Sequence, residues 1–309
     1  GVTMERFDKY WAESPLGKPK IGKLQFRVIP DGESRMAELM TGGVDWIWRV
    51  PSDQAEQLRA APNITVLNSE TMRVGFLQFD TLGRAKENSP LKDVRVRQAI
   101  AYAIDRKAMV DNLVRGASRV MNALCFVDQF GCTDQGVPRY AYDPAKAKAL
   151  LKEAGYEKGF EIDLGAYRER DYAEAVIGYL GAVGIKVRLN YLRYAAFRDS
   201  LRAGKVSIGY QTWGSFSVLD VSAFDGVYFR GGEEDLTRDP QVIADLQKGD
   251  SSTDPETRKA AYAKALQRIA AEAYALPMFS YSTNYAFTSD LNFTAQPDEV
   301  ARFYAASWK

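Results

Sequence analysis

At 309 residues the chain is long enough for two domains of ordinary size. Its 41 basic and 40 acidic residues nearly cancel, which argues against a nucleic-acid-binding surface, and no apolar run approaches the length of a membrane span. The absence of histidine excludes the His-dependent serine, cysteine and metal hydrolases, although an enzyme that uses a carboxylate pair stays possible. The polar opening lacks the apolar core of a signal peptide, so we expect either a cytosolic protein or a processed or truncated form.

The first 80 residues alternate between short strands and short helices. Strands are predicted over 23–29, 45–50, 64–69 and 73–79, and helices over 33–41 and 53–61. Asp31 is placed to cap the first helix and Gly42 to end it. The expected order is therefore strand, helix, strand, helix, strand, strand.

The stretch 89–116 predicts two consecutive helices that open a second lobe. In the first, five apolar residues recur at helical spacing and should share one buried face: Val96, Ala99, Ile100, Ala103 and Ile104. Arg95, Arg97 and Gln98 fall on the other side. Asp93 and Asp105 can cap the two helices, and Gly116 can end the second, which should bury Met109, Val110, Leu113 and Val114.

Both cysteines, Cys125 and Cys132, lie in a predicted loop over 117–142. In an oxidising compartment they would form a local disulfide, whereas otherwise they would stay two free thiols. Their spacing is too wide for a CxxC redox motif, and no other soft ligands exist to complete a zinc site.

From residue 143 onward the chain repeats strand–helix units. Strands are predicted over 160–164, 185–192 and 206–213, with helices over 144–154, 172–183 and 195–204. The unit 160–192 is a βαβ unit, so its strands should be parallel. Asp-Pro pairs open helices over 239–249 and 254–274, and 276–287 predicts a pair of strands. The aromatic tail should pack onto the body, which makes the fold class α/β with mixed sheets in two lobes.

Several stretches together resemble the extracellular solute-binding proteins of ABC importers, family 5, which bind peptides, oligopeptides or nickel. They are RFDKYW, GKPKIGKLQFRVIPD, MAELMTGGVDWI, VGFLQFD, PLKDVRVRQAIAYAIDRKAMVDNLVRG, YAYDPAKAKALLKEAG and YAKALQRIAAEAYALPMFSY. They occur in the family's order and cover nearly the whole chain. The resemblance implies a two-lobed periplasmic-binding-protein-like fold of type II, cluster C.

Members of that family usually carry a long further segment before the RFDKYW-like stretch. The resemblance therefore implies that this chain is a carboxy-terminal portion from which most of the first lobe is absent. On that basis residues 1–77 and 282–309 are a remnant of lobe I, and residues 78–281 form a complete lobe II. The hinge strands would lie near VGFLQFD and LPMFSYSTN.

The first candidate site is the stretch 210–220, at the carboxyl end of a predicted strand, where ligands gather in open α/β sheets. Trp213 offers a flat wall, Gly214 lets a ligand approach the backbone, and Ser215 offers a hydroxyl. The alternative is that Trp213 is a core residue followed by a surface loop.

The resemblance complicates this site. Peptide binders of the family place an aspartate three residues after the matching tryptophan, where it pairs with the ligand's α-amino group. Here that position is Phe216, and the nearest acid is Asp220. The resemblance thus favours a modified peptide, a sugar or another small solute over a standard dipeptide.

The second candidate site is the stretch 165–172. Related binders use an arginine in this region for a ligand carboxylate, and Arg168 or Arg170 could serve because a guanidinium offers two parallel donors. Tyr167 could stack on the ligand. The alternative is a solvated loop whose charges pair locally with Glu169 and Asp171. Phe79 and Asp80, at the first crossing between the lobes, rank third.

The sequence and the resemblance together predict the substrate-binding component of an ABC importer, which captures a small solute and delivers it to a membrane permease. We expect a monomer, periplasmic or extracellular and membrane-anchored, that uses no cofactor, binds no nucleic acid and performs no chemistry. Two alternatives stay open: a hydrolase that uses a carboxylate pair, and a ligand-sensing partner of a membrane receptor.

Overall fold

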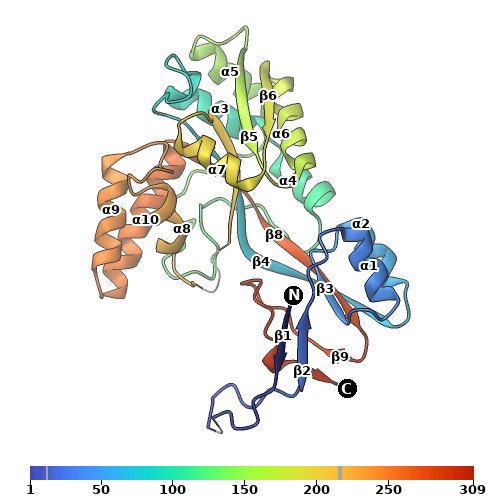
Figure 1. The fold of residues 1–309 in the computed structure, drawn as a ribbon. Coiled ribbons are helices and arrows are strands. Elements are labelled where there is room, and N and C mark those ends of the chain that lie inside the picture. The colour runs from blue at the N-terminus through green and yellow to red at the C-terminus, as the bar shows by residue number, and fades with distance from the viewer. Residues whose placement is uncertain (12, 215–217) are drawn as a thin grey trace. The chain divides into compact units, whose positions relative to one another are not determined.

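The chain divides into two units that share two long strands, as seen in a computed structural model that describes residues 1–11, 13–214 and 218–309 (Figure 1). Unit 1 comprises Gly1–Thr71, Val114–Ala117 and Ser282–Lys309, and unit 2 comprises Met72–Leu113 and Ser118–Tyr281. Strands β4 (Ile64–Phe79) and β8 (Ala275–Thr288) each run from one unit into the other. The predicted α/β class is confirmed.

Unit 1 is built from short elements around β3 and the end of β8. Its elements are β1 (Val2–Glu5), β2 (Lys23–Phe26), α1 (Gly32–Met40), β3 (Trp46–Trp48), α2 (Ser52–Arg59), β9 (Leu291–Asn292), a 3₁₀ turn (Phe303–Ala305) and β10 (Ser307–Trp308). The pairs β1–β2, β3–β8 and β9–β10 are all antiparallel. Asp31 caps α1 as predicted, by accepting a hydrogen bond from the amide of Ser34 at 2.8 Å.

Apolar surface stays open on unit 1. All four residues of β1 and three of the four in β2 are exposed. A cavity of about 640 Å³ is lined by aromatic residues, among them Phe26, Trp46, Trp48, Phe303 and Trp308. Val28 also lines this cavity and keeps 80% of its surface accessible. Unit 1 therefore exposes several large apolar side chains, including Val2, Met4, Phe26 and Val28.

Unit 2 is a sheet flanked by helices. Its helices are α3 (Val94–Ala103), α4 (Arg106–Met109), α5 (Pro144–Glu153), α6 (Arg170–Ala182), α7 (Tyr194–Arg202), α8 (Ser222–Tyr228), α9 (Pro240–Ser251) and α10 (Pro255–Ala271). Its own strands are β5 (Phe160–Ala166), β6 (Ile185–Tyr191) and β7 (Ile208–Gly214). Strand β8 neighbours β4, and the order continues β4-β7-β5-β6. Because β5 runs parallel to both β6 and β7, the predicted βαβ unit is confirmed.

The core of unit 2 lies under α8, α9 and α10. Helices α9 and α10 lie side by side (Figure 1), and their apolar faces enclose Phe224, Phe229, Tyr262 and Leu266, all 2% exposed or less. Each of these two helices begins at an Asp-Pro pair whose carboxylate accepts from the first-turn amides. The local start signals therefore placed both helices correctly.

Two predictions of separate strands are wrong, and one strand was not predicted. Residues 64–69 and 73–79 belong to one continuous strand, β4, because the chain stays extended through residues 70–72 instead of turning there. Likewise, the pair of strands predicted over 276–287 is the single strand β8. Strand β1 was not predicted at all.

The predicted outer face of α3 also needs correction. Arg97 is only 3% exposed, and its guanidinium donates to the carbonyls of Leu91 and Glu272 at 2.7 and 2.6 Å. Buried carbonyls compensate the charge that periodicity placed in solvent. The second helix of the stretch is shorter than predicted, since α4 passes into a π-helical turn over Val110–Val114.

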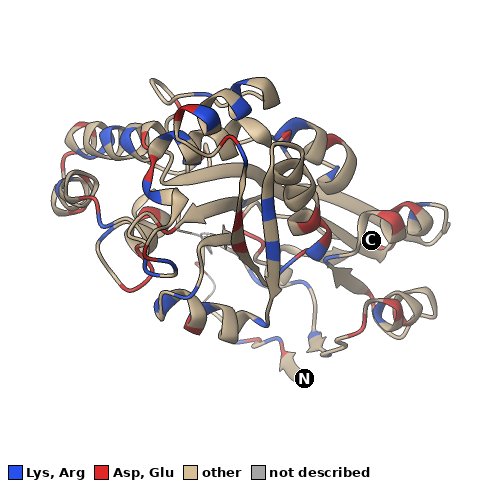
Figure 2. Cartoon of the chain, turned by 90° about the horizontal axis from the view of Figure 1, so that it is seen from above, with Lys and Arg blue, Asp and Glu red and all other residues tan. Residues whose placement is uncertain are grey.

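Residues of both charges occur over the whole ribbon. Figure 2 shows Lys and Arg together with Asp and Glu on many of its segments, which agrees with the near-zero net charge. In the part of the chain that the structure describes, no helix is long and apolar enough to cross a membrane.

Candidate functional site

The two leading candidate stretches meet at the carboxyl ends of β5 and β7. These strands are parallel neighbours, with Ala166 at the end of β5 opposite Tyr210 of β7. Tyr167 follows β5 directly, and its hydroxyl lies 3.2 Å from Oγ1 of Thr212, the residue before Trp213. The sheet therefore brings the stretches 165–172 and 210–214 together, at the edge where α/β sheets place ligands.

Tyr167 is held by an aromatic cluster. Its ring lies 5.0 Å from that of Tyr194 and 5.1 Å from that of Phe197, centre to centre. Phe197 is fully buried, whereas Tyr194 is exposed. Tyr167 thus packs between a buried ring and an exposed ring. Its own ring could line a ligand site while its hydroxyl stays close to Thr212.

Arg168 stands in a charged and aromatic setting. Its Nη2 lies 2.8 Å from Oε1 of Glu169, and the centre of its guanidinium lies 5.4 Å from the ring of Tyr281. The hydroxyl of Tyr281 donates to Oε2 of Glu169 at 3.2 Å. Burial lowers the pKa of Arg168, but Glu169 and Tyr281 outweigh it and leave the pKa raised, so the guanidinium stays charged.

Glu169 has an unusual backbone conformation. Its φ of 34° lies in the left-handed region that non-glycine residues seldom adopt. This residue immediately precedes α6, and its carboxylate holds both Arg168 and Tyr281. Backbone strain of this kind concentrates at functional sites.

The sequence did not indicate Arg73, Thr212 or Tyr281 as site residues. Arg73 pairs with Gly214 across the strands, and its Nη1 donates to Oγ1 of Thr212 at 3.2 Å. Both side chains are buried, at 7% exposure each. Thr212 falls within the predicted stretch 210–220 but was not singled out there. No local pattern could have indicated Arg73 or Tyr281, because both are far from the two candidate stretches in the sequence.

Trp213 is half-buried beside the core of unit 2. Its ring contacts Tyr228 at 5.9 Å and Phe224 at 6.3 Å between ring centres. Its indole N–H is buried and has no hydrogen-bond partner among the described residues. Trp213 therefore combines the two roles weighed above, a core contact and a position at a strand end. Ser215 and Phe216 lie outside the described residues.

Asp220 is already engaged within the protein. Its carboxylate pairs with Nη2 of Arg258 at 2.7 Å and accepts from the amide of Ser222 at 3.0 Å, at the start of α8. A carboxylate with these two partners is compensated internally. It is therefore a poor substitute for the aspartate that peptide binders place near the tryptophan.

The other candidates lie apart from this group. Arg170 pairs with Glu174 on the exposed side of α6. Phe79 pairs with Ile208 at the start of β7, whereas Trp213 is near its end, so Phe79 and Asp80 occupy the opposite end of that strand. Asp80 is buried, which raises the pKa of its carboxyl, and it accepts from the amide of Ala85.

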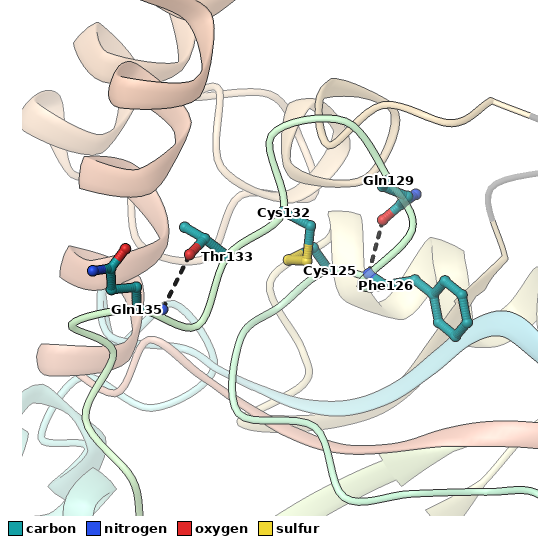
Figure 3. The surroundings of a disulfide bond; sticks show 6 residues. All are labelled: Cys125, Phe126, Gln129, Cys132, Thr133 and Gln135. Carbon is teal, nitrogen blue, oxygen red and sulfur yellow. Dashed lines mark hydrogen bonds between the residues drawn. A yellow bond between two sulfur atoms is a disulfide. The ribbon is translucent and has the colours of Figure 1, made fainter. Parts of the chain in front are cut away.

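The two cysteines form a disulfide within the loop that precedes α5. The Sγ atoms of Cys125 and Cys132 are bonded (Figure 3). Of the alternatives that the spacing left open, the disulfide is therefore confirmed. Among the described residues no cluster of three or more His, Cys, Asp or Glu side chains could hold a metal ion.

Comparison with known proteins gives a consistent result. A sequence model of the bacterial extracellular solute-binding proteins, family 5 Middle, matches residues 1–235. The dipeptide-binding protein of Escherichia coli is 31% identical over 213 residues, which cover 66% of this chain and 38% of the relative. The glutathione-binding protein GsiB of Salmonella paratyphi A is 25% identical over all of this chain and 61% of its own length.

Solved structures agree with the sequence comparisons. The structure of HbpA2 from Haemophilus parasuis matches with a TM-score of 0.80 and 26% identity, covering all of this chain and 61% of its own. This chain thus spans less than two thirds of the relatives that it matches along its whole length.

Proposed function

We propose, because this chain belongs to the bacterial extracellular solute-binding proteins of family 5, that it forms part of a protein that captures a small solute for import. The ligand would bind where β5 and β7 end, against Tyr167, Arg168 and Trp213. One observation carries this proposal. The ring of Tyr167, the charged guanidinium of Arg168 and the carboxylate of Glu169, whose backbone is in the left-handed region, lie together where β5 and β7 end.

Arg168 suggests the chemistry of the ligand. Its Nε and Nη2 both face the same oxygen of Glu169, which, as far as the described residues go, leaves the N–H groups of Nη1 for another acceptor. An anionic group, such as the carboxylate of a peptide-like solute, would supply that acceptor. Glu169 and Asp220 are each paired with an arginine, so neither resembles the free carboxylate pair that a glycosidase needs.

The wider role follows from the family. The complete protein would work outside the cytoplasmic membrane as a monomer and deliver its solute to an ABC permease. Unit 2 would correspond to the second lobe of a two-lobed binding protein, and unit 1 to a part of the first.

The test is calorimetric titration of the chain with dipeptides, tripeptides and glutathione, followed by two matched variants. Arg168→Gln should weaken binding of a carboxylate ligand about tenfold or more, because a charge-assisted hydrogen bond is lost. Arg170→Gln, two residues away on an exposed face, should leave the affinity unchanged.

Two results would contradict the proposal. The first is an equal effect of both substitutions, which would remove Arg168 from the site. The second is consumption of a bound solute, detected by mass spectrometry, which would show an enzyme.

A further inference from the structure

The disulfide loop is hydrogen-bonded to the segment that follows the candidate site. The amide of Phe130 donates to the carbonyl of Leu219 at 2.8 Å, and the amide of Val221 donates to the carbonyl of Phe130 at 3.0 Å. Phe130 and Asp220 thereby form a parallel β-bridge between two segments far apart in the sequence. Residues 219–221 therefore take their backbone partners from inside the Cys125–Cys132 loop.

Arg258 of α10 connects the same two segments through side chains. Its Nη2 lies 2.7 Å from Oδ2 of Asp220, and the centre of its guanidinium lies 4.7 Å from the ring of Phe130. The side chain is about three-quarters buried. One arginine thus fixes Asp220 and Phe130 together, in addition to the backbone bridge.

The loop itself is anchored on both sides of Phe130. Cys125 is 1% exposed and belongs to the core of unit 2. The side chain of Gln129 accepts from the amide of Phe126 at 2.9 Å, across the turn that the disulfide closes (Figure 3). At Gly131, φ is 82° and an added Cβ would lie 2.6 Å from the ring of Tyr262. Only glycine allows this approach to α10.

From these contacts we propose that the 125–132 loop is a positioning element for the candidate binding site. Phe130 holds residues 219–221, and both Phe130 and Trp213 pack against the core cluster that contains Cys125. The disulfide holds Phe130 in place by closing its loop onto the core. This role rests on the proposed function, because it requires that a ligand binds at the end of β7.

A positioning role and a purely stabilising role predict increased hydrogen exchange in different regions when the disulfide is removed. If the disulfide only stabilised unit 2, removing it would raise hydrogen exchange throughout the unit. If it positions the segment, exchange should rise locally at residues 218–222, while β5 and β6 stay protected. Hydrogen exchange of the native chain separates the two cases without a ligand.

The experiment compares the wild-type chain with a Cys125→Ala/Cys132→Ala variant by exchange and mass spectrometry. We expect peptides over 218–222 to exchange at least tenfold faster and peptides over 160–191 to remain unchanged. No change at 218–222, or equal acceleration in both regions, would overturn the proposal.

A second variant keeps the disulfide and protects the test against misfolding. Arg258→Met removes the side-chain link to Asp220 and Phe130, and it should accelerate exchange at 218–222 by a smaller factor. Arg139→Met is its control, because Arg139 forms an exposed pair with Asp134 outside the disulfide loop and, among the described residues, no ion pair with that loop. Unchanged exchange in Arg258→Met would count against the proposal even if the cysteine variant cannot be purified.

The consequence for binding is measured in the same proteins with a Met-Leu dipeptide and glutathione as probes. Where the wild type binds a probe, we expect the cysteine variant to bind it about tenfold more weakly, mainly through faster dissociation. Equal affinity of the wild type and the cysteine variant for a probe would show that the loop does not position the binding site. If the wild type binds neither probe, that counts against the proposed function, while the exchange result still decides the positioning.

Discussion

Asp239 and Asp254 are both N-cap residues, but we expect them to contribute different amounts to the stability of the fold. Both are N-caps of a helix that opens with proline. Asp239 is 6% exposed and pairs with Arg268 at 2.7 Å, whereas Asp254 is exposed and bonds only within its own first turn among the contacts described. Burial opposes the charge of Asp239, but hydrogen bonds from Arg268 and Tyr274 outweigh it and lower the pKa to about 2.

This difference predicts a pH-dependent effect of Asp239→Asn. Because the folded-state pKa of Asp239 is depressed from its usual 3.8, its stabilising contribution is present above about pH 4 and is lost as the pH falls through about 2. At pH 7 the substitution should lower the free energy of unfolding by about 2 kcal/mol. Urea denaturation at several pH values measures this.

The matched control is Asp254→Asn. It should cost less at pH 7, since an exposed cap has no buried ion pair to lose. Equal losses in the two variants, or a loss at Asp239 that does not shrink between pH 4 and pH 2, would show that the ion pair with Arg268 contributes little.

At the scale of elements, α3 depends on one buried arginine. Arg97 donates to carbonyls at both ends of its reach, in the turn before α3 and in the segment that links α10 to β8. Arg95, two residues earlier, pairs with Asp93 and also donates to the carbonyl of Glu153 at the end of α5. Its side chain is 45% exposed, however, so its partners lie near water, whereas Arg97 is buried between the elements that it joins.

We expect Arg97→Met to destabilise the protein by about 3 kcal/mol, because the carbonyls that it satisfies would stay buried without a donor. Arg95→Met should cost less than about 1 kcal/mol, as exposed ion pairs do. Thermal or urea unfolding of the two variants provides the comparison. If Arg97→Met lowers the free energy of unfolding no more than Arg95→Met does, water satisfies these carbonyls and α3 does not depend on Arg97.

The sequence was sufficient where the determinants are local. Asp143, Asp239 and Asp254 each mark a helix start, because capping depends on the next three residues. The parallel pairing of β5 with β6 was also predicted, whereas the position of β7 beside β5, which brings the two stretches together, was not. The burial of Arg97 and the arrival of Arg73 beside Thr212 were not predictable, because their partners come from distant segments.

At the scale of the whole molecule, the two units differ in how much apolar surface they leave open. Unit 1 carries the cavity of about 640 Å³ and the exposed strands β1 and β2. The relatives that match this chain throughout are longer than it is. Unit 1 also holds most of the large apolar side chains that are exposed among the described residues, including Phe7, Trp11 and Val28.

The chain alone should bind the dye ANS at unit 1, because the dye binds accessible apolar clefts. Val28→Asp, at the cavity, should reduce the dye's fluorescence markedly. Val127→Asp alters a residue of unit 2 that is also exposed, at 49%, and should leave the fluorescence nearly unchanged. Equal reduction by both substitutions would place the dye elsewhere.

The way in which the chain crosses between the units also predicts the order in which the two units fold. Unit 2 is nearly continuous in sequence, whereas β3 of unit 1 pairs with Tyr285–Phe287 near the other end of the chain. During synthesis, the apolar residues of α1, β3 and α2 emerge first but must wait for the strand that completes their sheet. Unit 2 can fold in the meantime. Unit 1 is therefore the part whose newly made chain most needs protection by chaperones, and its completion should be the last step of folding.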